Sequence, residues 1–179
     1  MNEQNTKRKW AVAFGHLGFI YATLSAVPIP LLWLRSHNML RLTIATVFLA
    51  CFLIVLSIMH FRTRNWKRFA FLFALAALYG WLTTLVKRPE EQIHFIQYGL
   101  VGVLFARALQ DHLGRSTKTD AIAFSIAMLA GWVDELIQGQ LPNRHYDVRD
   151  LYLNAVSAFL GLVVYRTIPP RNQEKLTWR

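Results

Sequence analysis

The sequence predicts an all-α, polytopic membrane protein of about six transmembrane helices in one bundle. Three long runs, residues 10–34, 42–59 and 69–86, contain no Asp, Glu, Lys or Arg. Crossing about 30 Å of hydrocarbon takes roughly 17–25 apolar residues, so each run is long enough for one span. Three shorter apolar segments, each bounded by charges, would complete the bundle at residues 93–106, 121–133 and 151–165.

The first run has features of both a retained helix and a cleaved signal peptide. Basic residues precede it, and small residues stand at Ser25 and Ala26. Its apolar stretch continues beyond Pro28 and Pro30, which exceeds the usual signal-peptide core of about 7–15 residues. We therefore expect a retained first helix that bends or ends near the prolines.

The remaining segments form the loops of a single domain over residues 1–179. Loops are predicted at 35–41, 60–68, 87–92, 107–120 and 139–150. We expect the first three helices within residues 10–86, and a second part at 89–168 that carries unusual polar residues.

Lys and Arg are distributed unequally between the two sides of this bundle. One side has fourteen: Lys7, Arg8, Lys9, Arg62, Arg64, Lys67, Arg68, Arg107, Arg115, Lys118, Arg166, Arg171, Lys175 and Arg179. The other side has six: Arg35, Arg41, Lys87, Arg88, Arg144 and Arg149. Because cytoplasmic loops carry the excess of basic residues, the bias predicts that both termini are cytoplasmic.

The formal net charge of +10 does not indicate nucleic-acid binding. The basic residues stand in short loops between apolar runs, where lipid headgroups are the nearest anions. We therefore expect membrane lipids as partners and no nucleic acid.

Polar and ionisable residues interrupt the second half of the chain in three clusters. They are Glu91, His94 and Tyr98; Asp134, Glu135 and Gln138; and Arg144, Asp147, Asp150 and Asn154. A charge in the bilayer centre costs about 2.5–3.5 kcal/mol or more, so such groups need partners or water. The predicted orientation brings all three clusters to the extracytoplasmic face, which indicates one site.

Helical spacing places the members of each cluster on one helix face. Glu91, His94 and Tyr98 are three and seven residues apart, and Asp147, Asp150 and Asn154 repeat this spacing. A carboxylate is also favourable at a helix N-terminus, so one of the two aspartates could be a cap. The apolar segments are short of the ~30 Å hydrocarbon core, which predicts that the carboxylates lie in a depression of the outer surface.

These residue types indicate proton transfer and anion binding. The candidate catalytic residues are Glu135, Asp134, His94 and Asp150, because clustered carboxylates and a histidine can act as acid and base. The candidate ligand-binding residues are Arg144, Gln138, Asp147, Asn154, Tyr98 and Glu91, with the Arg144 guanidinium suited to phosphate or carboxylate. Oxygen ligands could alternatively hold a divalent metal, although no metal-ligand signature identifies a metal site.

The order of these residues resembles the VanZ-like family. The resemblance rests on Asp134-Glu135-x-x-Gln138, Arg144, Asp147 with Asp150, Asn154 and Gly161, and on His94-Phe95 with Tyr98. It covers the part expected at 89–168. The resemblance implies a multi-pass protein of the bacterial cytoplasmic (inner) membrane. Some family members are linked to low-level resistance to the glycopeptide teicoplanin.

Three functions fit this sequence. The protein could modify a lipid-linked envelope molecule, or it could bind an envelope precursor or a glycopeptide without turnover. It could instead be an assembly subunit whose polar residues only hold the bundle together, with Arg144 paired to Glu135 and Asp147. The polar residues stop near Tyr98, Gln138 and Ser157, which disfavours a channel.

Overall fold

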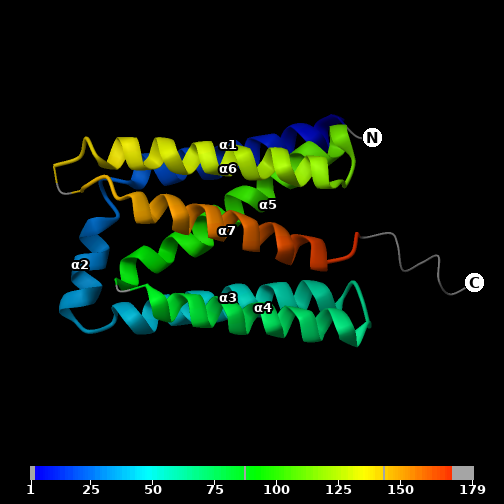
Figure 1. The fold of residues 1–179 in the computed structure, drawn as a ribbon, viewed down its shortest axis with the longest axis horizontal. Helices are drawn as coiled ribbons and strands as arrows, with labels where there is room; N and C mark the ends of the chain where they lie inside the picture. Colours follow the sequence, from blue (N-terminus) through cyan, green and yellow to red (C-terminus); the bar gives the residue numbers. More distant parts are fainter. Residues whose placement is uncertain (1–2, 87, 143, 171–179) are drawn as a thin grey trace, which may run out of the picture.

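The computed structural model describes residues 3–86, 88–142 and 144–170, and these fold into α-helices without any strand (Figure 1). Four of the basic residues used for the charge bias, Lys87, Arg171, Lys175 and Arg179, lie outside this part. In chain order the helices are α1 (Glu3–Thr23), α2 (Pro28–Ser36), α3 (Leu40–His60), α4 (Trp66–Leu85), the short 3₁₀ helix η1 (Pro89–Gln92), α5 (Ile93–Leu113), α6 (Thr117–Gln138) and α7 (Val148–Thr167).

The first predicted helix is broken near the prolines, as expected. α1 ends at Thr23, and α2 begins at Pro28 after a bend of 65°. Pro28 and Pro30 stand in the first turn of α2. Backbone N–H groups there have no partner within the helix, so proline, which has no N–H, breaks no hydrogen bond. α2 consequently lies across one end of the bundle instead of continuing α1 (Figure 1).

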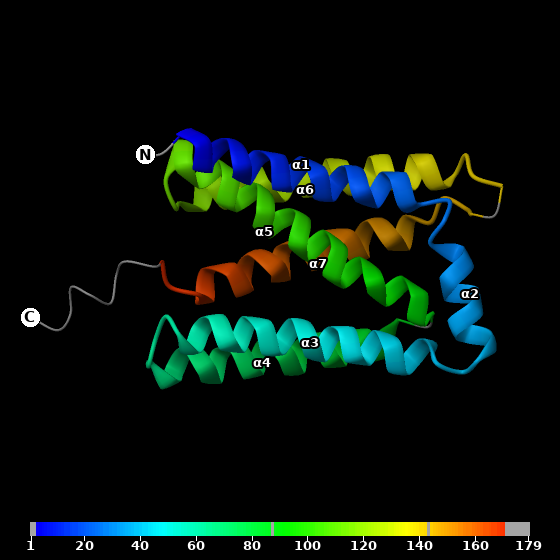
Figure 2. The same ribbon diagram turned by 180° about the vertical axis from the view of Figure 1, so that it is seen from behind.

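The long helices run back and forth between two ends of the molecule. The beginning of α1 and the end of α7 lie at the same end, together with the α3–α4 and α5–α6 loops (Figure 1 and Figure 2). α2, η1 and the α6–α7 loop lie at the other end (Figure 1). We call these the terminal end and the α2 end.

Several of these helices are long and apolar enough to cross a membrane. α3, α4 and α7 meet this condition by length and composition, and the bent pair α1 and α2 would bring the number to four. α5 and α6 are of similar length but do not meet the condition on composition. α5 lies at the centre, in contact with α1, α6 and α7.

The last three long helices extend further than predicted. The segments 93–106, 121–133 and 151–165 are parts of α5, α6 and α7, which have 21, 22 and 20 residues. At about 1.5 Å per residue these helices are roughly 30 Å long, which is enough to cross the hydrocarbon core. The depression was predicted from helices shorter than the core, and that premise is wrong. The helices continue through the charged residues because those residues find partners within the bundle.

Small residues allow α5 and α7 to pack closely. A Cβ atom at Gly161 would overlap the backbone of Gly99, and one at Gly102 would lie 3.2 Å from the carbonyl oxygen of Ala158. Such close approach of backbones is typical of helix packing in membranes. The crossing fixes the register that aligns the polar residues on the two helices.

Candidate polar site at the α2 end

Polar side chains from three helices meet inside the α2 end of the bundle. The buried members are His94 and Tyr98 on α5, Asp134, Glu135 and Gln138 on α6, and Asp150 and Asn154 on α7. Each is at most 9% exposed, and Tyr98 and Glu135 are fully buried. The predicted convergence of the three clusters is therefore confirmed for these seven residues, which we call the polar cluster.

Tyr98 and Asp134 link α5 to α6. The Tyr98 hydroxyl donates a hydrogen bond of 2.8 Å to Asp134 Oδ2. The other carboxylate oxygen, Oδ1, is buried without a hydrogen-bond partner among the described residues. Asp134 therefore keeps one free acceptor inside the protein.

His94 links α5 to α7. Its Nδ1 atom lies 2.9 Å from Asn154 Oδ1, and its Nε2 atom lies 4.0 Å from Asp150 Oδ2. With the amide oxygen as acceptor, Nδ1 carries the proton and Nε2 faces the Asp150 carboxylate. The imidazole also stacks on the Tyr98 ring, with ring centres 6.1 Å apart. Its orientation is thus fixed from two sides.

Glu135 anchors the loop between α6 and α7. Its Oε1 accepts a hydrogen bond of 3.2 Å from Gln138 Nε2, and its Oε2 accepts one of 3.0 Å from the Asp147 backbone N–H. A fully buried carboxylate with these partners holds the loop to the end of α6. This role is structural, and it does not depend on a ligand.

Asp147 is the cap of α7 and faces away from the polar cluster. Its side chain accepts a hydrogen bond from the Arg149 backbone N–H and forms an ion pair of 2.6 Å with the Arg149 guanidinium. The Arg149 side chain is the main cause that lowers the pKa of the Asp147 carboxyl. The capping alternative is confirmed for Asp147, whereas Asp150 belongs to the cluster.

Glu91 also stands apart from the cluster. It lies in η1, before α5 begins, so the predicted stripe with His94 and Tyr98 is incomplete. Arg88 approaches its carboxylate at 3.7 Å. Burial raises the pKa of the Glu91 carboxyl, and the negative charge of Asp150 adds to this effect.

Arg144 does not form the ion pairs with Glu135 and Asp147 that the assembly-subunit interpretation predicts. Glu135 and Asp147 have the other partners described above, and the buried Nε of Arg144 has no hydrogen-bond partner among the described residues. The expected pairing of Arg144 with these two acids is therefore wrong. A guanidinium without a carboxylate partner is suited to bind an anion from outside.

A small cavity connects Arg144 to the polar cluster. It has a volume of about 30 Å³ and lies under the α1–α2 bend, between Thr23, Leu31, His94, Asp134 and Arg144. This volume holds about one water molecule. The predicted open depression is therefore only a narrow cavity, because α2 covers the cluster.

Two residues that the sequence did not single out for this site help to build it. The Tyr21 hydroxyl of α1 donates a hydrogen bond of 2.8 Å to the Ala130 carbonyl, one turn before Asp134. A Cβ atom at Gly131 would lie 2.9 Å from Asn154 Nδ2, so glycine makes room for that amide. The polar hydroxyl of Tyr21 in the middle of the apolar run 10–34 is the signal that could have identified it.

No three His, Cys, Asp or Glu side chains of the described residues are arranged to hold a metal ion. The polar cluster offers free acceptors and a histidine beside a carboxylate, and the neighbouring Arg144 offers a guanidinium without an ion pair in the described part of the chain.

Comparison with known proteins identifies the part of the chain that carries this cluster. Residues 90–169 match the family model VanZ/LLP1. This part of the chain is VanZ-like. The match contains η1 from Glu90 onward together with α5, α6 and α7, and hence all seven residues of the polar cluster. No curated protein and no solved structure matches the chain significantly.

Proposed function

We propose that this VanZ-like protein is a six-span protein of the bacterial cytoplasmic membrane that binds an acidic cell-envelope ligand at its outer face. In this proposal both termini are cytoplasmic and the α2 end is extracytoplasmic, as the excess of basic residues at the terminal end supports. Arg144 receives the acidic group of the ligand, which is a lipid-linked precursor or a glycopeptide such as teicoplanin.

The observation that carries this proposal is a group of buried polar atoms without partners. Asp134 Oδ1, Asp150 Oδ1, Asn154 Nδ2 and Arg144 Nε all lack a hydrogen bond among the described residues. Leaving one such group unpaired costs about 1–3 kcal/mol, and more if the group is charged. A bundle that needed only stability would have these groups paired or replaced. Their retention in one place supports a ligand or water as the missing partner.

The unpaired polar atoms include hydrogen-bond donors and acceptors, and both suit an envelope ligand. The Arg144 guanidinium provides donors for a phosphate or carboxylate, and Asp134 and Asp150 provide acceptors for hydroxyl or amide groups of a sugar or peptide. The small cavity means that only a part of the ligand enters unless α2 moves. Binding is therefore better supported than turnover.

Modification of the bound ligand is the second candidate. His94 Nε2 and Asp150 Oδ2 are 4.0 Å apart, a distance at which a small rearrangement or one water would permit proton transfer. Asp134, which keeps one carboxylate oxygen free, would supply the further acid or base that hydrolysis of a lipid-linked molecule requires.

The test compares Arg144→Gln with Arg149→Gln in cells that carry equal amounts of each protein in the membrane. Both changes remove one positive charge from the same end, but Arg149 is exposed and paired with Asp147. Teicoplanin susceptibility and the mass spectrum of envelope lipids and wall precursors are recorded for each strain. Loss of the wild-type phenotype with Arg144→Gln alone supports the proposal.

Stability separates this proposal from a purely structural role. Arg144 forms no ion pair within 4.0 Å among the described residues, although its charge acts on Asp134 and Asp150, so Arg144→Gln should cost less stability than Glu135→Gln, which should weaken the α6–α7 loop. If Arg144→Gln lowers the melting temperature as much as Glu135→Gln does, Arg144 is part of a stabilising network and the proposal fails. A precursor that accumulates only when Asp150→Asn is expressed would establish turnover.

A further inference from the structure

A second cavity lies at the terminal end, far from the polar cluster. It has a volume of about 650 Å³, within the range of about 300–1,000 Å³ typical of small-molecule sites. α4 and α6 form its two sides, and α7 lies between them and contacts both (Figure 1). We call this cavity the α4–α6 groove.

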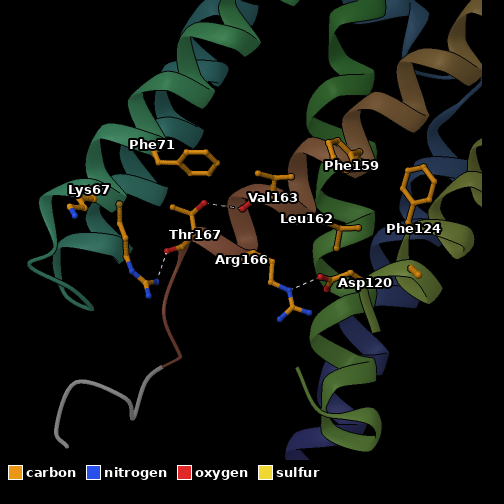
Figure 3. A pocket seen from close by; sticks show the side chains of 11 residues that line it. Lys67, Phe71, Asp120, Phe124, Phe159, Leu162, Val163, Arg166 and Thr167 are labelled. Carbon is orange, nitrogen blue, oxygen red and sulfur yellow. Dashed lines mark hydrogen bonds and ion pairs between the residues drawn. The ribbon is translucent and has the colours of Figure 1, made fainter. Parts of the chain in front are cut away.

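The part of the groove nearer the middle of the bundle is apolar. Phe71 of α4, Phe124 of α6 and Phe159 of α7 surround it, with Leu162 and Val163 between them (Figure 3). Phe71 is 49% exposed and Phe159 is 58% exposed. Such a surface is favourable only against another apolar surface, such as an acyl chain.

The part nearer the terminal end is cationic. Lys67, Arg68 and Arg166 line it, together with the single acid Asp120 (Figure 3). Arg166 Nε donates to Asp120 Oδ2 at 2.5 Å, and Arg68 donates to the Thr167 carbonyl at 2.9 Å. Three cations against one carboxylate leave a net charge of +2, and the exposed Lys67 ammonium has no described partner. This end is complementary to an anion.

An exposed tryptophan indicates that the cationic part of the groove lies at the depth of the lipid headgroups. Trp66, the residue before Lys67, is 71% exposed at the start of α4. Exposed tryptophans of membrane proteins concentrate at the boundary between headgroups and acyl chains. The groove runs along the helices from this level towards the middle of the bundle, so its apolar part is accessible to lipid tails.

We infer that the α4–α6 groove binds one anionic glycerophospholipid of the leaflet at the terminal end. One acyl chain lies against Phe71, Phe124 and Phe159, and the phosphate lies near Lys67 and the free donors of Arg68 and Arg166. Binding depends on the chain crossing the membrane, as in the proposed function, but it does not depend on the polar cluster. The groove would therefore be occupied whether or not an envelope ligand is bound.

The test is native mass spectrometry of the full chain in detergent, titrated with phosphatidylglycerol or with phosphatidylcholine of the same acyl chains. We expect one phosphatidylglycerol per chain and weaker binding of phosphatidylcholine. Ala121→Trp places a large side chain at an exposed position of the groove and should abolish retention of the lipid. Leu129→Trp, at a position 61% exposed on the same helix but outside the groove, is the matched control and should bind normally.

The headgroup contact is tested by Lys67→Gln, with Lys118→Gln as control. One basic residue near a membrane surface contributes about 1 kcal/mol, so Lys67→Gln should weaken phosphatidylglycerol binding about fivefold. Lys118 is exposed at the same end but does not line the groove, and its replacement should have little effect.

Four results would overturn the inference. The first is equal retention of both lipids, and the second is unchanged lipid binding by the Ala121→Trp variant. The third is binding of inorganic phosphate that survives Ala121→Trp while no lipid is retained. The fourth is a dimer that Ala121→Trp dissociates. The third would assign the cations to a free anion, and the last would assign the groove to a helix of a second copy. A phenotype that Arg144→Gln leaves unchanged would overturn the proposed function but leave this inference untouched, so the two proposals fail separately.

Discussion

Gly99 of α5 and Gly161 of α7 face each other where the two helices cross, and the backbone of Gly99 leaves no space for a methyl group at Gly161. This crossing lies between the polar cluster and the terminal end of the molecule. It sets the axial position of His94 relative to Asn154, whose side chains meet at 2.9 Å. The close approach of two glycines thus determines how the polar residues pair.

Gly161→Ala should therefore destabilise the bundle strongly. The added methyl must push the two helices apart, and overpacking of this kind costs typically about 1–3 kcal/mol. The matched control is Gly80→Ala in α4, where nothing lies within 4 Å and helix propensity favours alanine. Denaturant titration of the purified protein, followed by tryptophan fluorescence, gives the free energies of unfolding. Equal stability of the two variants would contradict the crossing.

Tyr98→Phe should weaken the link between α5 and α6. The change removes the buried 2.8 Å hydrogen bond from the Tyr98 hydroxyl to Asp134 Oδ2. A loss of about 1–3 kcal/mol is expected. Tyr152→Phe, at an exposed position of α7, should change nothing. In the double variant with Asp134→Leu the penalty for Tyr98→Phe should largely disappear, and a full penalty there would contradict the pairing.

Glu91→Gln should stabilise the protein at neutral pH. Burial, with the negative charge of Asp150, raises the pKa of Glu91, so the folded protein holds this proton more tightly than the unfolded chain. Its contribution to stability is complete below the unfolded pKa of about 4.3 and is lost as the pH rises through the folded pKa. Melting temperatures of wild type and Glu91→Gln should agree near pH 4 and diverge at pH 7, with the variant higher. A variant that melts lower at pH 7 would contradict the raised pKa.

Asp147→Asn should show the opposite pH dependence. The ion pair with Arg149 lowers the pKa of Asp147, so its contribution is present above the unfolded pKa of about 3.9 and is lost as the pH falls through the folded pKa. Asparagine can still cap α7, which isolates the ion pair from the cap. The variant should melt slightly lower than wild type at pH 7, and salt should reduce the difference because the pair is exposed. A difference that grows below pH 4 would contradict this assignment.

Arg115→Lys should loosen the end of α7. The Arg115 guanidinium donates at 2.7 Å and 2.8 Å to the carbonyls of Tyr165 and Ile168, and it lies 4.8 Å from the centre of the Tyr165 ring. Lysine keeps the charge but cannot reproduce this planar geometry. Hydrogen exchange should become faster in the last turn of α7 and stay unchanged in α6. Lys118→Gln is the control, and unchanged exchange in the Arg115→Lys variant would show that the guanidinium does not hold this end.

Much of the fold could be predicted because helix formation is decided locally. The charge-free runs became α3 and α4, and the break before Pro28 follows from the geometry of proline. The segments predicted for α5, α6 and α7 were too short, because charged residues were taken as boundaries. Residues such as Asp134 and Asp150 stay helical because they are buried against partners up to 56 positions away, which a local pattern does not contain.

The sequence by itself determined the helical class, the direction changes of the chain and the three groups of polar residues that meet at one end. These follow from apolar run length and from the 3.6-residue period of the helix, which act over a few turns. Only the tertiary structure decided which polar residue has a partner: Asp147 turns to Arg149, Glu135 to the loop backbone, and Arg144 to none of them. Hydrogen bonds and ion pairs form within about 3–4 Å, so these choices depend on how the helices cross, which the glycines at positions 99 and 161 fix.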